Sequence, residues 1–251
     1  MKLVAIHGLG SASTAWDLIR PDLAVDFEFI TFDLPGHGDA FMLANKTMKP
    51  EILAQIVKNE LNAIGIENFH LIGNSLGGWI CLELASQFPN NVDSVTAVAP
   101  AGLWLKPKIN RDGELAISRY LAKATYRAAN LLSRFKAIRA LGFKLVSPQW
   151  EKFSVKTCAQ AAIAMGSASG YFTLWDAFLG NRFEKNIDSK IPVTIIFGDS
   201  DNTLPADSCQ EKSLAPSHAK WIVLPQSGHA PMWDQVTEVI EITKNTIAAT
   251  A

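Results

Sequence analysis

The sequence has little cysteine, no excess of charge of either sign and no long hydrophobic run. Its three cysteines, Cys81, Cys158 and Cys209, lie far apart, which excludes a disulfide framework and a CxxC metal or redox pair. A formal net charge of −1 leaves no uniform basic field for a nucleic-acid backbone. No apolar run approaches the ~18 residues of a membrane span. The apolar segment in the start MKLVAIHGLGS is shorter than that of a signal peptide. We therefore expect a cytoplasmic protein with reduced thiols.

The sequence does have short apolar runs that alternate with segments of helical spacing. Because 48% of its 251 residues are hydrophobic, the chain can bury a sizeable core and is not disordered. Fully apolar runs of this length are typical of strands covered on both faces. The alternation predicts a doubly wound, mostly parallel α/β sheet of about six strands. The expected strands are Lys2–His7, Phe27–Leu34, Phe69–Gly73, Val95–Ala99, Val193–Gly198 and Trp221–Leu224. The expected helices between them are Thr14–Leu23, Pro50–Ile64, Leu76–Phe88, Leu204–Leu214 and Pro231–Ala248.

One region breaks this alternation. Residues 102–186 contain no clear strand, and 115–141 and 152–179 have helical composition. We expect a core domain of residues 1–101 and 187–251, interrupted by a helical cap of residues 102–186. An insertion at this point follows the carboxyl end of a strand, which is where open sheets bind ligands.

The strongest chemical signal is a G-x-S-x-G motif centred on Ser75. It follows an apolar strand and precedes a helix, so it predicts a nucleophile elbow in which a sharp turn exposes a strained serine. Gly73 and Gly77 remove side chains that would collide at the turn. Because a helix begins at once, free backbone amides are available for a developing oxyanion.

A second motif, HGLG at positions 7–10, ends the first expected strand. It is similar to a loop that supplies the second oxyanion donor, so the backbone N–H groups of Leu9 and Leu76 are the predicted oxyanion hole. His7 is more simply explained as a structural histidine that holds the loop.

The remaining catalytic candidates follow the last two strands. The sequence GDSD offers two carboxylates, of which the spacing favours Asp201 over Asp199 as the group that orients a histidine. His229, in SGHAP, is the histidine that directly follows the last strand and suits a general base. The chain order Ser75, Asp201, His229 differs from both protease orders. His70 and His218 have no such context.

Together these motifs resemble the α/β-hydrolase superfamily over essentially the whole chain. The matching segments are HGLG, DLPGHG at 33–38, GNSLGG, GDSD and SGHAP. The resemblance implies a serine carboxylesterase-like acyl-ester hydrolase with a Ser-His-Asp triad, an acyl-enzyme intermediate and neither metal nor organic cofactor. Two features depart from the family: Asp39 and Ala40 follow DLPGHG where a serine is usual, and the common first hairpin is missing.

Other activities on the same fold remain alternatives. Ser75 as nucleophile excludes the dehalogenase and epoxide hydrolase groups, which use Asp. GNSLGG is similar to the GNSMGG of C–C bond hydrolases, but Ala230 stands where those enzymes usually have Trp. A C–C hydrolase, a hydroxynitrile-lyase-like enzyme and a non-catalytic receptor of this fold are the rivals, and an intact triad disfavours the receptor.

The cap carries an unusual charge. Residues 106–156 contain twelve basic and three acidic side chains, a net +9 against −10 elsewhere. This charge is either a solvated helix face or a positive surface that steers anionic acyl esters or an acidic acyl-carrier protein to the site. Aromatic residues interleaved with the charges are either core or the lining of an acyl pocket for a small-molecule ester: Trp104, Phe135, Phe143, Trp150, Phe172, Trp175 and Phe178.

Overall fold

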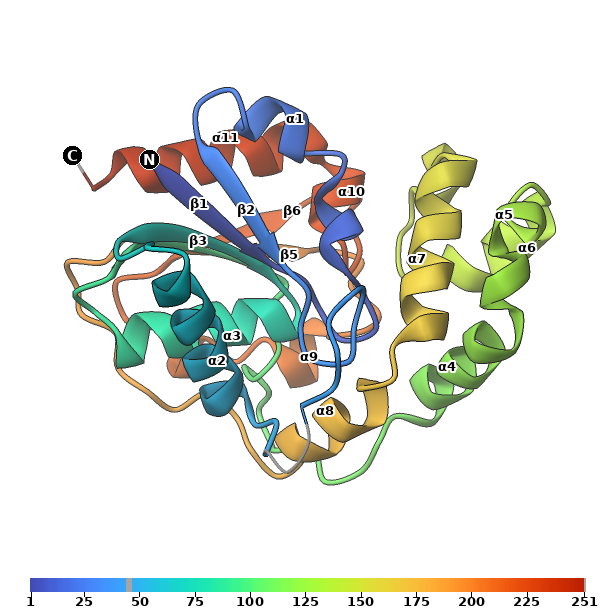
Figure 1. Ribbon diagram of the computed structural model, residues 1–251, viewed down its shortest axis with the longest axis horizontal. Helices are drawn as coiled ribbons and strands as arrows, with labels where there is room; N and C mark the ends of the chain where they lie inside the picture. The colour runs from blue at the N-terminus through green and yellow to red at the C-terminus, as the bar shows by residue number, and fades with distance from the viewer. Residues whose placement is uncertain (44–46, 251) are drawn as a thin grey trace.

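A computed structural model describes residues 1–43 and 47–250. Six parallel strands form one sheet in the order β2-β1-β3-β4-β5-β6, as the sequence predicts (Figure 1). The chain starts in the middle of the sheet, adds β2 on one side and then crosses to add the other strands in succession. The strands are β1 (Lys2–Ile6), β2 (Glu28–Phe32), β3 (Phe69–Asn74), β4 (Val92–Val98), β5 (Val193–Gly198) and β6 (Lys220–Leu224).

The central strands are apolar on both faces because helices cover both sides of the sheet. In β1, Val4 and Ile6 pack on one face, whereas Leu3 and Ala5 pack on the other. Helices α2 (Pro50–Ala63) and α3 (Leu76–Gln87) cover the first face, and α1 (Arg20–Leu23) and α11 (Val236–Ala248) lie on the opposite side (Figure 1). This two-sided burial explains why the strands show no polar alternation.

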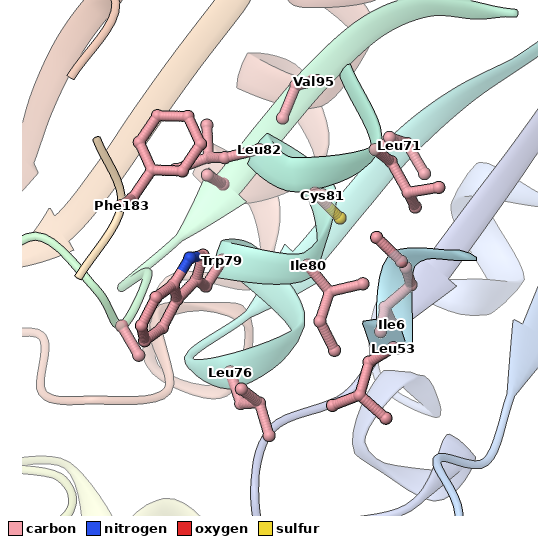
Figure 2. Close-up of a cluster of buried hydrophobic side chains, with 14 of the residues drawn as sticks. Ile6, Leu53, Leu71, Leu76, Trp79, Ile80, Cys81, Leu82, Val95 and Phe183 are labelled. Atoms are coloured by element: carbon pink, nitrogen blue, oxygen red, sulfur yellow. The ribbon is translucent and has the colours of Figure 1, made fainter. Parts of the chain in front are cut away.

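Helix α3 is the centre of the larger core cluster. Its residues Leu76 to Ala85 are all buried, so the helix is apolar all round rather than amphipathic. Trp79, Ile80 and Leu82 point to different sides of the helix, and Phe183, from the far end of the insertion, packs beside it (Figure 2). This tight burial fixes the helix whose first residue follows Ser75.

Several expected helices are broken into shorter pieces. Thr14–Leu23 was expected as one helix but forms the 3-10 helix η1 (Ser13–Trp16) and α1, and 204–214 forms α9 (Ala206–Cys209) and η4 (Lys212–Leu214). The last helix is interrupted at Gln235 between α10 (Pro231–Asp234) and α11. In each region the apolar spacing is helical, but tertiary contacts decide where the helix stops.

The insertion between β4 and β5 is helical, as expected, but consists of more elements than the two long segments foreseen. They are α4 (Gly113–Thr125), η2 (Tyr126–Ala128), α5 (Ala129–Leu132), α6 (Lys136–Phe143), η3 (Trp150–Lys152), α7 (Val155–Ser167) and α8 (Tyr171–Phe178). Asp112 caps α4 by accepting from the amides of Glu114 and Leu115, and Ser154 caps α7. Helices α4 to α7 form a lobe beside the sheet, whereas α8 returns toward the core (Figure 1).

The helices and the cysteines agree with what the sequence indicates about membrane spans and disulfides. Within residues 1–43 and 47–250, no helix combines the length and hydropathy needed to cross a membrane. The three cysteines are free thiols, all buried. Burial raises the pKa of each, for Cys158 to about 11.

Candidate active site

Ser75 lies at a strained turn between β3 and α3. Its backbone has φ 54° and ψ −117°, a combination that costs a residue with a side chain of order 1–3 kcal/mol. The turn is held from both sides: the Ser75 amide donates to Val98 O at 3.0 Å, and Ser75 O accepts from the amides of Trp79 and Ala101. The side chain is half-buried at the carboxyl end of the sheet. The strained turn between a strand and a helix that the motif predicts is present at Ser75.

The flanking glycines are required because the turn packs directly on backbone. A Cβ on Gly77 would lie 2.0 Å from Ile6 O, and one on Gly73 would lie 2.3 Å from Gly77 O. Gly8, in the HGLG loop, would place a Cβ 3.0 Å from Ser75 Cβ. The HGLG loop and the serine therefore touch, which brings the first two sequence motifs together.

His229 and Asp201 form a hydrogen-bonded pair. His229 Nδ1 and Asp201 Oδ2 are 2.9 Å apart, the histidine side chain is 13% exposed and the carboxylate is fully buried. The other carboxylate oxygen accepts from the amides of Thr203 and Leu204 at 2.9 and 2.8 Å. The carboxylate is thus oriented by three donors, and Nε2 is the ring nitrogen left for a substrate-side proton.

Asp199, the competing carboxylate, has a different environment. It is exposed and accepts from Ser200 Oγ at 2.8 Å and the Ser227 amide at 3.3 Å. The bond from Ser227 joins the loops that follow β5 and β6. Asp199 makes no hydrogen bond to His229 among the described residues, so the geometry favours Asp201, as the spacing does.

Asn74 connects the histidine loop to the elbow. Its Nδ2 donates to His229 O at 3.1 Å and to Val98 O at 3.2 Å. Because Asn74 immediately precedes Ser75, this amide ties the backbone of the histidine loop to the strand end that carries the serine. Within the described ranges no hydrogen bond joins Ser75 Oγ to His229, and such bonds often tighten only when substrate binds.

Asp234 is a site residue that the sequence analysis missed. It accepts from the Gly228 amide at 2.8 Å and from the hydroxyl of Ser147, a buried residue of the insertion. The adjacent Val146 O accepts from the His229 amide at 2.8 Å. Burial raises the pKa of Asp234. The insertion therefore helps to fix the backbone that carries the histidine.

The DLPGHG loop supports the HGLG loop. His7 is fully buried, its Nδ1–H donates to Gly8 O at 2.8 Å, and its Nε2 accepts from the Leu34 amide at 3.0 Å. Burial lowers the pKa of His7, which keeps the ring neutral and fits a structural role. Asp33 accepts from the amides of Ser13 and Asp39 at 2.7 and 3.0 Å.

The two predicted oxyanion donors lie at the junction of these loops. Leu9 follows Gly8, on which a Cβ would contact the Cβ of Ser75. Leu76 is the first residue of α3. Among the described residues, neither the Leu9 amide nor the Leu76 amide donates a hydrogen bond within the protein. Both amides are thus available to a ligand oxygen.

The structure does not gather the predicted aromatic residues into one acyl pocket. Trp104 and Trp175 are buried in a packed cluster, with Trp104 Nε1 bonded to Asn181 O at 2.8 Å and Trp175 stacked on Phe178. Phe135 is 58% exposed. The other three have different partners: Phe143 packs on Phe153, Trp150 lies beneath Lys136, and Phe172 packs at a tilt against Tyr120.

The site has no donor set for a metal. In the part of the chain that the structure describes, no group of three or more His, Cys, Asp or Glu side chains could hold an ion. What the arrangement offers is a half-buried hydroxyl, an imidazole oriented by a carboxylate and two amides without a partner in the protein.

Known proteins resemble this chain along its length. It is 27% identical over 257 residues to the pimeloyl-[acyl-carrier protein] methyl ester esterase of Pseudoalteromonas atlantica, covering 98% of this chain and 94% of the relative. It is 26% identical over 238 residues, 94% of this chain, to the dihydrolipoyllysine-residue acetyltransferase component of the acetoin cleaving system of Pseudomonas putida, of which it spans only 60%. The solved structure of a meta-cleavage product hydrolase from Pseudomonas fluorescens superposes with TM-score 0.73 at 17% identity, covering 100% of this chain and 92% of the other.

A family model described as the alpha/beta hydrolase fold matches residues 3–236. This match includes all six strands, the strained serine and the Asp201–His229 pair. The chain therefore belongs to the alpha/beta hydrolase fold family.

Proposed function

We propose that the protein is a serine hydrolase that cleaves a carboxylic ester or related acyl bond through an acyl-enzyme intermediate. The observation that carries the proposal is the Asp201–His229 hydrogen bond of 2.9 Å, whose histidine backbone is tied through Asn74 to the residue that precedes the strained Ser75. A serine on a strained elbow, a base and an orienting acid are the parts that nucleophilic acyl transfer requires.

The mechanism follows from the position of each group. Ser75 Oγ attacks the substrate carbonyl carbon while His229 Nε2 accepts the hydroxyl proton. Asp201 keeps the proton of Nδ1 in place and stabilises the imidazolium. The amides of Leu9 and Leu76 hold the developing oxyanion, each donor contributing about 3 kcal/mol to lowering the barrier. His229 then protonates the leaving alcohol, and a water molecule, deprotonated by the same ring, hydrolyses the acyl-enzyme.

We further propose that residues 102–186 act as a cap over this site. The segment carries the net positive charge and contacts the His229 loop through Val146 and Ser147. An esterase of carrier-bound acyl groups is among its relatives. Anionic acyl esters, and esters presented by an acidic acyl-carrier protein, are therefore favoured substrates.

A panel of p-nitrophenyl esters tests the proposed reaction. The esters span acyl length and include matched neutral and anionic acyl groups. A dienoic C–C substrate and a cyanohydrin are assayed beside them. We expect a burst of p-nitrophenol followed by turnover, and loss of both in Ser75→Ala. Cleavage of the dienoate or cyanohydrin without ester turnover would refute the ester assignment, and undiminished turnover by Ser75→Ala would refute the nucleophile.

The carrier proposal has its own test. The methyl ester of a dicarboxylic acid is offered either free or linked to an acyl-carrier protein. We expect a higher kcat/KM for the linked form, and equal values would remove the carrier from the proposal.

A further inference from the structure

A cavity lies within the insertion, and neither Ser75, Asp201 nor His229 lines it. It has a volume of about 480 Å³, which is in the range of small-molecule sites. Helix α4 supplies one side, the α7–α8 turn supplies another, and Phe172 of α8 completes it. Ser167 and Ser169, both exposed on the turn, add hydroxyl groups to its lining.

Arg119 is the charged side chain of this cavity. It is only 5% exposed and donates to the carbonyls of Gly166 and Ala168 at 3.2 and 2.7 Å. Among the described residues its Nε has no hydrogen-bond partner, and no carboxylate lies within 4.0 Å of the guanidinium. Buried charges in proteins are normally paired, so a buried arginine without a carboxylate that lines a cavity suits an anionic ligand.

The remaining lining matches an anion with an apolar body. Lys123 lies one helical turn after Arg119 on α4 and also lines the cavity. Tyr120 and Phe172 pack against each other with ring centroids 5.3 Å apart. A carboxylate or phosphate can therefore be bound by two cations while its apolar part lies against the aromatic rings.

The cavity shares one wall with the active-site loop. Tyr171 lines it, and Cε2 of the same ring lies 2.6 Å from the position that a Cβ would take on Gly10. Gly10 is next to the oxyanion residue Leu9. The cavity is thus separate from the elbow but in contact with it through one buried ring.

We propose that this cavity is a binding site for a small carboxylate or phosphate that bears an aromatic or aliphatic body. Its guanidinium anchor is Arg119, with Lys123 as the second cation. The ligand is either the acid end of a substrate or a separate effector. Binding to the cavity does not require the hydrolysis proposed above.

Calorimetry on the Ser75→Ala protein tests the site with 4-phenylbutanoate and its neutral amide. We expect the acid to bind at least tenfold more tightly than the amide. Lys123→Gln, which changes an exposed residue, should weaken the acid about tenfold, and Ser167→Trp should fill the cavity and abolish binding without touching the hydrogen bonds of Arg119. Lys156→Gln removes the same charge from an exposed position outside the cavity and should bind as the parent does.

Inhibition kinetics on the unsubstituted Ser75 enzyme then distinguish the two sources. Competitive inhibition of neutral-ester hydrolysis by 4-phenylbutanoate assigns the cavity to the substrate, and non-competitive inhibition or activation assigns it to an effector. Equal binding of acid and amide, or unchanged binding by both Lys123→Gln and Ser167→Trp, overturns the proposal. Failure of ester hydrolysis would overturn the proposed function and leave the binding result standing.

Discussion

Ser75, His229 and Asp201 differ in how much of their geometry is local. The serine is set by the conformation of its own strained backbone, whereas the histidine depends on bonds from three other segments: Asp201, Asn74 and Val146. In the proposed mechanism, a substitution at any of these three positions impairs the same transfer of a proton from serine to imidazole. Their effects on rate should therefore not add.

The first prediction concerns these three residues. Ser75→Ala, His229→Ala and Asp201→Asn should each lower kcat by about 10⁴-fold or more, and a double variant should lose no more than the worse single one. Steady-state kinetics on a p-nitrophenyl ester is the measurement. Asp199→Asn is the matched control, and if it abolished activity while Asp201→Asn kept it, the acid would be misassigned.

The second prediction concerns His37, whose buried ring lies beside that of His7. The Nδ1–H of His37 donates to Pro35 O at 3.1 Å. Burial lowers its pKa to about 3. In the unfolded chain the ring has its ordinary pKa near 6.5, so between these values the unfolded state binds a proton that the folded state does not. His37 therefore destabilises the folded state as the pH falls below about 6.5, by up to about 1.4 kcal/mol per pH unit, and has no such effect above it.

Urea denaturation at several pH values measures this. His37→Asn keeps a donor near Pro35 O and cannot titrate, so its unfolding free energy should fall less steeply than that of the parent between pH 6.5 and 5. Parallel curves for the two proteins would show that His37 does not remain neutral in the fold.

At the scale of elements, the packing of α4 on α7 depends on Gly166. A Cβ there would lie 2.3 Å from Tyr126 Cβ and 2.6 Å from Ala122 O. Gly142, in α6, has nothing within 4 Å of its pro-Cβ position. The two glycines thus occupy helices of the same lobe in opposite environments.

The third prediction follows from that contrast. Gly166→Ala should destabilise the protein by about 1–3 kcal/mol, because backbone must move to admit the methyl group. Gly142→Ala should stabilise it by about 0.5–1 kcal/mol, because alanine gains helix propensity without a clash. Chemical denaturation gives both values, and a stabilising Gly166→Ala would contradict the close approach of α4 and α7.

The sequence predicted all six strands but missed several helix ends that depend on tertiary contacts. The inner strands β1, β3, β4 and β5 are apolar runs because both of their faces are covered, whereas the edge strands β2 and β6 are only partly buried, and β4 begins at Val92 rather than Val95. The breaks at Ala168–Gly170 and Gln235 were not foreseen, because they are set by packing: Gly170, for example, approaches Pro35 O and donates to Gly36 O. The motifs around Ser75, Asp201 and His229 carry local signatures, whereas Asp234 has none, since its partners Gly228 and Ser147 are joined only by the fold.

At the scale of the whole molecule, charge is divided between the insertion and the rest of the chain. Residues 106–156 carry a net +9 and the remainder −10. Arg127, Arg134 and Lys144 are exposed, whereas Arg119 is buried and contributes to a cavity rather than to the outer surface. Separation of this kind attracts anions to one side of the molecule.

The fourth prediction is a dependence on salt. kcat/KM for an anionic ester should fall as the screening length shrinks from about 10 Å at 0.1 M salt to about 3 Å at 1 M, whereas that of a neutral ester of equal length should not. The triple variant Arg127→Glu, Arg134→Glu, Lys144→Glu should remove the difference and leave kcat for the neutral ester unchanged. The same salt response for both esters would mean that the charge is only a solvated face.

The bonds from Val146 and Ser147 to the His229 loop restrict which insertions this core can accept. In this protein the segment between β4 and β5 also holds the histidine loop in place. The Val146 carbonyl accepts from the His229 amide, and the Ser147 hydroxyl donates to Asp234. A chimera that received the insertion of another family member would keep its serine and carboxylate intact. Its histidine loop would lose two hydrogen bonds unless the grafted insertion placed a carbonyl beside the His229 amide and a donor beside the Asp234 carboxylate. Exchange of substrate range by grafting is therefore confined to insertions that restore these two hydrogen bonds.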